Sequence, residues 1–120
     1  MSDLSHLEGR AVLVTGAAGC IGAWTVKLLT EIGAVPVVFD LTDNRQRLEL
    51  IMDDAESVTW ELGDITDFER LQAVAEKHNI EAIIHLAALQ VPFCKADPVG
   101  STKINIIGST HILELARLRG

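Results

Sequence analysis

The fold of this chain is decided by the stretch AVLVTGAAGCIG at residues 11–22. Its first five residues are apolar and rich in β-branched side chains, which favours a strand buried on both faces. Glycines then stand at positions 16, 19 and 22, directly before a segment with helical spacing. We expect Gly16 to allow a tight turn, Gly19 to let backbone N–H groups approach a phosphate, and Gly22 to let the helix pack close to the strand. The stretch therefore predicts a strand-turn-helix unit that holds a pyrophosphate.

Three further apolar runs extend this unit into an alternating pattern. Strands are predicted at residues 11–15, 35–39, 58–62 and 82–86, and helices at residues 21–32, 43–52, 67–78 and 99–118. The third run alternates apolar and polar residues more than the others do, which suits an edge strand. The order predicts one domain over residues 1–120, an α/β fold of the Rossmann type. Its doubly wound parallel sheet has about four strands in the order 3-2-1-4 and helices on both faces.

Apolar spacing assigns a buried side to each predicted helix. In the first helix, Ile21, Trp24 and Leu28 fall on the apolar side together with Val26, Leu29 and Ile32. The third helix begins with a capping pattern, Thr66 followed by Glu69. In the last helix the apolar positions repeat at intervals of three and four, at Ile104, Ile107, His111, Ile112, Leu115 and Leu118.

Composition narrows the class of protein. With 48% hydrophobic and 22% charged residues among 120, one compact domain is expected. No apolar run approaches the length of a membrane span, and the first residues lack a secretion signal, so we expect a soluble, cytoplasmic protein without membrane contact. Two cysteines without metal-ligand spacing predict no metal site. The net charge of -7, with scattered Lys and Arg, argues against a nucleic-acid partner.

Asp40 closes the second predicted strand, where a carboxylate can accept both ribose hydroxyls of an adenosine. A 2′-phosphate there would meet like charge, so the cofactor is expected to be NAD rather than NADP. Arg45 and Arg47 follow and could soften that preference, although arginines on an acidic helix are more often solvated. The competing interpretation is an ordinary loop of another α/β fold. A P-loop is excluded, because Gly22-Ala23-Trp24 lacks the Gly-Lys-Ser/Thr that such a loop needs.

Four motifs together resemble the extended short-chain dehydrogenase/reductases, specifically the NAD-dependent epimerase/dehydratase family that works largely on nucleotide sugars. They are the glycine turn Thr15–Gly22, with Cys20 where phenylalanine is usual, the turn Gly63–Asp67, the strand end His85–Ala88, and the helix with Asp97-Pro98 and Asn105. The resemblance implies that Asp64 and the Ile65 backbone meet the adenine. It also implies that the loop at residues 90–94 borders the nicotinamide and substrate.

The expected cofactor-binding residues combine the motifs with the strand ends. They are Gly16, Ala18, Gly19, Cys20, Ile21, Gly22, Asp40, Leu41, Asp64, Ile65, Leu86, Ala87, Ala88 and Asn105. Several have a second interpretation. In that interpretation Asp64 caps the third helix, Ala87 and Ala88 serve tight packing, and Asn105 is a buried structural amide. His85 and Cys20 are expected to be structural rather than catalytic.

No catalytic residue is expected in this chain. In the family, a Tyr-x-x-x-Lys pair exchanges a proton with the substrate, and the 120 residues contain no tyrosine. The sequence is expected to end before a fifth strand and before the substrate region, so it would be inactive alone. An exposed fourth strand would then pair with another copy. The alternative function is a non-catalytic dinucleotide-binding module that regulates a partner or serves as a scaffold.

Overall fold

The computed structural model describes residues 5–87 and 95–120. Its centre is a parallel sheet of four strands in the order β3-β2-β1-β4, which confirms the predicted order. The strands are β1 (Ala11–Thr15), β2 (Val35–Asp40), β3 (Thr59–Leu62) and β4 (Ala82–His85). The third strand lies at an edge, as its alternating pattern predicts. The connections reverse direction between β1 and β4, and in doubly wound folds a ligand binds at the carboxyl ends of such strands.

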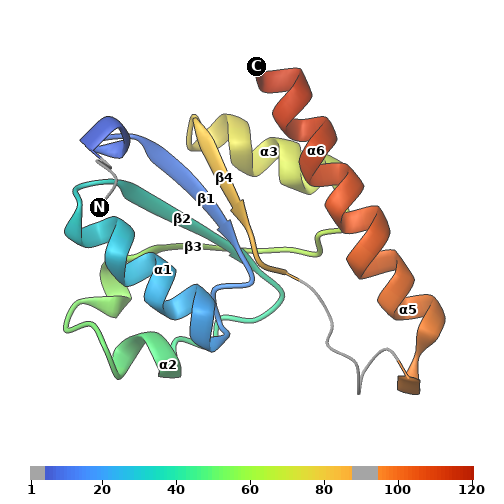
Figure 1. Cartoon of the computed structure of the whole chain (residues 1–120), viewed down its shortest axis with the longest axis horizontal. Coiled ribbons are helices and arrows are strands. Elements are labelled where there is room, and N and C mark those ends of the chain that lie inside the picture. The colour runs from blue at the N-terminus through green and yellow to red at the C-terminus, as the bar shows by residue number, and fades with distance from the viewer. Residues whose placement is uncertain (1–4, 88–94) are drawn as a thin grey trace.

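Helices cover both faces of the sheet, with α1 and α2 on one side and α3 and α6 on the other (Figure 1). The α-helices are α1 (Cys20–Glu31), α2 (Gln46–Glu49), α3 (Phe68–Lys77), α5 (Pro98–Thr102) and α6 (Gly108–Arg119). A π-helical turn, η3 (Lys103–Ile107), joins α5 to α6, and short 3₁₀ turns form η1 (Ser5–Leu7) and η2 (Ala55–Ser57).

The side chains of each central strand pack into two separate hydrophobic cores, one on each face of the sheet. Val12 and Val14 of β1 pack with residues of α1 and α2, whereas Leu13 between them packs with residues of α3 and α6. All three are at most 1% exposed. Because successive side chains of a strand point to opposite faces, a strand covered on both sides must be apolar throughout. This explains why residues 11–14 of β1 are all apolar, while the buried Thr15 that ends the strand has its hydroxyl hydrogen-bonded.

The buried side of α1 differs in part from the predicted one. Val26 and Leu29 are buried as predicted, whereas Ile21, Trp24 and Leu28 are 72%, 47% and 54% exposed. With about 3.6 residues per turn, Trp24 lies about half a turn round the helix from Gly22, which contacts the glycine turn, so Trp24 faces away from the sheet. Trp24 instead lies under the ammonium group of Lys27, 5.6 Å from the ring centroid.

The predicted helix at residues 43–52 is also wrong in length, because only Gln46–Glu49 forms α2. Leu48 is the one buried residue of this helix, so it has a single apolar anchor. Before it, Arg45 donates hydrogen bonds to Asp43 and to the carbonyl oxygens of Ala55 and Val58, which keeps the preceding segment out of the helix.

Two details of the later helices correct the sequence pattern. Asp67, not Thr66, caps α3, because its Oδ1 accepts the Arg70 N–H at 3.2 Å. In the last helical segment the turn η3 interrupts the α-helical repeat. A π-turn places more residues in one turn and rotates the following face. Ile112 and Leu115 are buried as predicted, while Ile107, within the π-turn, is 42% exposed. Leu118, in the last turn of α6, is 51% exposed.

Glu61 joins the edge strand β3 to α3. Its Oε1 accepts from Lys77 Nζ at 2.9 Å and lies 3.1 Å from His78 Nε2, and its Oε2 accepts from Arg70 Nη2 at 2.8 Å. The hydrogen bond from Lys77, with those from His78 and Arg70, lowers the pKa of Glu61 to about 2 although partial burial opposes this shift. The ionised carboxylate is therefore part of the folded structure.

This pKa predicts a loss of stability in acid. The folded pKa lies below the ordinary value of 4.5, so the contribution is complete above pH 4.5 and disappears as the pH falls toward 2. Replacing Glu61 by Gln should lower the free energy of unfolding at neutral pH by about 1–3 kcal/mol. It should also flatten the dependence of that free energy on pH between 4.5 and 2, measured by urea denaturation. An equal slope in both proteins would contradict this assignment.

The edge strand β4 pairs with β1 and, within residues 5–87 and 95–120, with no other strand. Unpaired backbone groups at such an edge favour pairing with another chain. Self-association through β4 stays a prediction, and sedimentation at increasing concentration tests it. A monomer at every concentration would contradict it.

Candidate functional site

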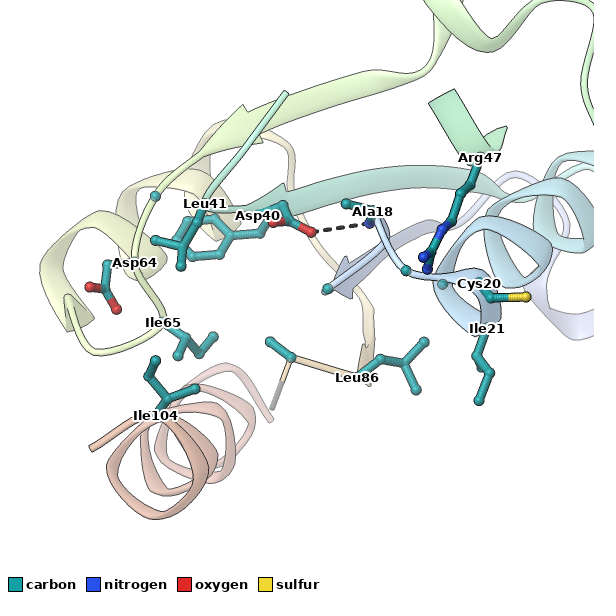
Figure 2. Close-up of a pocket in the computed structure, with 16 residues that line it drawn as sticks. Ala18, Cys20, Ile21, Asp40, Leu41, Arg47, Asp64, Ile65, Leu86 and Ile104 are labelled. Atoms are coloured by element: carbon teal, nitrogen blue, oxygen red, sulfur yellow. Dashed lines mark hydrogen bonds between the residues drawn. The ribbon is translucent and has the colours of Figure 1, made fainter. Parts of the chain in front are cut away.

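A cleft of about 520 Å³ opens at the carboxyl ends of the strands. The turns that follow β1, β2, β3 and β4 all contribute to its wall, and Ile104 of η3 faces them from the other side (Figure 2). Its volume falls within the range typical of small-molecule and cofactor sites. The sheet order therefore brings together segments that are far apart in the sequence.

The glycine turn forms one wall of the cleft, and its three glycines meet different surroundings. At Gly16, where φ is +77°, a Cβ would lie 2.8 Å from the backbone nitrogen of Ala87. At Gly22 a Cβ would lie 2.4 Å from the Ala17 Cα, inside the turn itself. At Gly19 the nearest atom is the Gly16 carbonyl oxygen, 3.8 Å away. Only Gly19 therefore leaves open space beside the backbone.

The N-terminus of α1 points its backbone amides toward this open space. Gly19 is the N-cap and supplies no side chain to accept a hydrogen bond, and Ala23 N donates to its carbonyl oxygen at 2.9 Å. The amides of Cys20, Ile21 and Gly22 precede this first helical bond. Such amides, with the helix dipole, attract anions.

Asp40 holds the end of β2 against the glycine turn. Its Oδ2 accepts the Ala18 N–H at 3.1 Å, the contact drawn in Figure 2, and its Oδ1 accepts the Thr42 N–H at 3.3 Å. Leu41 follows it and is 61% exposed while lining the cleft. The carboxylate thus lies next to Ala18 of the glycine turn.

The two arginines that follow have separate positions. Arg45 turns away from the cleft, where its Nη1 donates to the carbonyl oxygens of Ala55 and Val58 and its guanidinium lies 4.9 Å from the Trp60 ring centroid. Arg47 lines the cleft. Sequence position alone does not distinguish them, because both lie near the start of the same predicted helix.

The turn after β3 forms the opposite wall. Asp64 Oδ1 accepts from the Thr66 N–H at 2.9 Å and from the Thr66 hydroxyl at 2.7 Å, so it closes this turn. The interpretation of Asp64 as the cap of α3 is wrong, since Asp67 has that role. Ile65 is 5% exposed, and its carbonyl oxygen lies 3.0 Å from His111 Nδ1.

A chain of hydrogen bonds holds the end of β4 in place. Thr15 Oγ1 accepts the N–H groups of Leu86 and Ala87 at 3.0 and 3.2 Å and lies 2.6 Å from His85 Nδ1. The hydroxyl already accepts from two N–H groups, so its single hydrogen is donated to His85 Nδ1. Because Nδ1 is then an acceptor, Nε2 carries the ring hydrogen and donates it to Ser109 Oγ at 3.2 Å. The ring is therefore neutral.

Burial supports the same conclusion, since it lowers the pKa of His85 below 6.5. His85 does not line the cleft. Its contacts hold Leu86 and Ala87, which do line it. The ring thus supports the site without facing it.

Most of the expected residues meet at this cleft. Those lining it are Gly16, Ala18, Gly19, Cys20, Ile21, Gly22, Asp40, Leu41, Asp64, Ile65, Leu86 and Ala87. Asn105 is not among them, although its neighbour Ile104 is, and its carbonyl oxygen accepts from Ser109. Ala88 and the loop at residues 90–94 lie outside the described residues.

Four of the lining residues are absent from the expected set, namely Phe39, Arg47, Gly63 and Ile104. Phe39 is the residue before Asp40, and its ring lies beneath Gly63, where a Cβ would come within 2.5 Å of it. The strand-end position of Phe39 is a signal that could have identified it. Ile104 and Arg47 carry no such signal, because a π-turn and a short helix set their directions.

Two searches of the described residues are negative. None of the helices there is long or apolar enough to cross a membrane. No group of three or more acidic, histidine or cysteine side chains gathers to bind a metal ion in those ranges.

Comparisons with known proteins point to one family. The family model described as GDP-mannose 4,6 dehydratase matches residues 13–120. A UDP-glucose 4-epimerase from Rhizobium leguminosarum bv. trifolii is 41% identical over 118 residues, which are 95% of this chain and 34% of that protein. The chain therefore spans about a third of the length of such relatives.

Solved structures agree with this result. The UDP-glucose 4-epimerase of Brucella ovis in complex with NAD is 34% identical, with a TM-score of 0.77 over 92% of this chain and 33% of its own. An epimerase from Methanothermobacter thermautotrophicus is 30% identical, with a TM-score of 0.82 over 97% of this chain and 34% of its own. The chain thus belongs to the extended short-chain dehydrogenase/reductases, in the NAD-dependent epimerase/dehydratase family matched by the GDP-mannose 4,6 dehydratase model.

Proposed function

We propose that the cleft binds NAD and that these residues are the NAD-binding portion of an epimerase, dehydratase or dehydrogenase. The observation that carries the proposal is the cleft itself. The accessible backbone at Gly19 and the N-terminus of α1 lie on one wall of the cleft, and the Asp40 carboxylate lies on the adjacent wall. An anion fits the first two groups and a pair of ribose hydroxyls fits the third.

The glycine turn suits a pyrophosphate for a steric reason. A phosphate must approach backbone N–H groups to within hydrogen-bond distance, and a side chain at Gly19 would fill the space that it needs. Gly16 and Gly22 contribute indirectly. The first lets the turn contact Ala87 closely, and the second lets α1 pack closely on Ala17 of the turn. The closely packed Gly16 and Gly22 and the open Gly19 thus form one binding site for the pyrophosphate.

Asp40 supports NAD over NADP. The carboxylate already accepts the Ala18 and Thr42 N–H groups, and its remaining lone pairs suit the ribose hydroxyls of the adenosine. The 2′-phosphate of NADP would place two negative groups at one site. Brucella ovis UDP-glucose 4-epimerase, with its NAD complex, is consistent with this choice.

The chemistry of a bound NAD would be hydride transfer at the nicotinamide, with a nucleotide sugar or another hydroxyl compound as substrate. The 120 residues contain no tyrosine, so the proton exchange that the family assigns to tyrosine needs residues outside these 120. We therefore assign cofactor binding, and no catalytic step, to this chain. The substrate and the reaction belong to the longer enzyme.

Isothermal titration calorimetry of the chain with NAD and with NADP tests the proposal. We expect saturable binding of one NAD per chain and weaker binding of NADP. Equal affinity for both cofactors would contradict the assigned preference, and heat no greater than that of dilution would contradict dinucleotide binding.

A further inference from the structure

We propose that Arg47 binds the pyrophosphate of the dinucleotide from beside the N-terminus of α1. This inference rests on the proposed function. Arg47 extends from α2 toward the glycine turn (Figure 2), and its Nη1 lies 4.0 Å from the position that a Cβ would take at Gly19. A cation therefore lies beside the open glycine of the turn.

The other charged groups of the cleft have partners within the described residues. The three that line it are Asp40, Arg47 and Asp64. Asp40 accepts N–H groups from Ala18 and Thr42, and Asp64 accepts from Thr66. Across residues 5–87 and 95–120 the guanidinium of Arg47 forms no hydrogen bond or ion pair. Of the three charged groups it alone has no hydrogen-bond partner among the described residues, so all of its N–H donors are available to a ligand.

Arg45 provides a natural comparison two residues earlier. Its guanidinium donates hydrogen bonds to Asp43 and to three backbone carbonyl oxygens and lies over the Trp60 ring, so its function is structural. Nothing comparable fixes Arg47. Leu48 next to it is 2% exposed and anchors α2 in the core with α1. This packing fixes the backbone position of Arg47.

The ligand chemistry that fits Arg47 is a phosphate. A guanidinium donates two parallel N–H bonds to phosphate oxygens, and these charge-assisted bonds are stronger than neutral ones. The pyrophosphate is favoured over a 2′-phosphate because Arg47 lies beside Gly19, whereas the ribose site lies at the Asp40 carboxylate. The backbone amides at the N-terminus of α1 and the guanidinium of Arg47 would then bind the same anion.

Calorimetry with NAD and NADP on the Arg47→Gln chain tests the inference. We expect both affinities to fall by about tenfold, since both cofactors carry the pyrophosphate. Arg47→Lys should recover part of the loss because it keeps the charge. Thermal unfolding should be unchanged, because Arg47 supports no other described residue.

Arg117→Gln is the matched control. It removes the same charge from α6, where Arg117 pairs with the exposed Glu114 away from the cleft, and should leave both affinities unchanged. Wild-type affinity for NAD in Arg47→Gln would overturn the inference, and so would a loss confined to NADP, which would assign Arg47 to the 2′-phosphate. If the unmodified chain binds neither cofactor, the proposed function itself fails.

Discussion

Replacing Gly22 by Ala is expected to destabilise the chain by about 3 kcal/mol or more, because the added methyl group has no space. Its Cβ would lie 2.4 Å from the Ala17 Cα and 2.5 Å from the Gly16 carbonyl oxygen. Both are backbone atoms, so no side chain can rotate away. Either α1 must move off the sheet or the glycine turn must change shape. Urea denaturation followed by circular dichroism measures the effect.

Gly19→Ala is the matched variant, with the same change three residues earlier and the opposite expected result. Gly19 has φ -77° and ψ 174°, an ordinary extended conformation, and its Cβ would meet nothing closer than 3.8 Å. We expect stability within about 0.5 kcal/mol of the unmodified chain. NAD affinity should nevertheless fall by about tenfold or more, because the methyl group occupies the phosphate position.

The pair separates packing from binding. A Gly22→Ala chain as stable as the unmodified one would contradict the close packing of α1 on the turn. A Gly19→Ala chain with unchanged NAD affinity would contradict phosphate binding at the open glycine. The account requires the first variant to lose stability and the second to lose affinity.

Replacing Asp40 by Ala is expected to reverse the cofactor preference. The carboxylate loses its bonds to the ribose hydroxyls, and hydrogen bonds to charged groups are worth about 1.5–3 kcal/mol, so NAD affinity should fall by about 10- to 100-fold. NADP should bind the variant at least as well as it binds the unmodified chain, because the negative charge beside its 2′-phosphate is gone. Calorimetry with both cofactors measures the two changes.

Asp40 also bonds to the Ala18 N–H, so part of the loss could come from the glycine turn. Asp40→Asn keeps an acceptor for that N–H and removes the charge, and it should lose less NAD affinity than Asp40→Ala while gaining NADP affinity. Asp53→Ala removes an exposed charge elsewhere and should change neither affinity. An unchanged ratio of NAD to NADP affinity in Asp40→Asn would contradict the role of charge.

The sheet and the glycine turn could be predicted from sequence because their physical causes are local. The bounds of β1 agree with the run at residues 11–15, since a strand covered on both faces favours apolar and β-branched residues along its length. Asp40 is correctly predicted at the end of β2, because parallel strands bring their carboxyl ends to one edge. These features determine most of the cleft.

The remaining differences depend on packing that a linear pattern does not record. The buried side of α1 is set by the contact at Gly22, and Trp24, about half a turn away from that residue, faces away from the sheet. The register of α6 follows a π-turn that ordinary helical spacing does not indicate. Arg45 and Arg47 look alike in sequence, and only the carbonyl groups near Val58 separate their directions.

The most direct test of the account is a titration of the ¹⁵N-labelled chain with NAD, followed by amide chemical shifts. The account predicts the largest shifts at Gly19, Cys20 and Ile21, with further shifts at Asp40 and Asp64, and little change at Glu61 or along the outer face of α3. Shifts centred on α3, or no shifts at saturating NAD, would contradict dinucleotide binding at the carboxyl edge of the sheet.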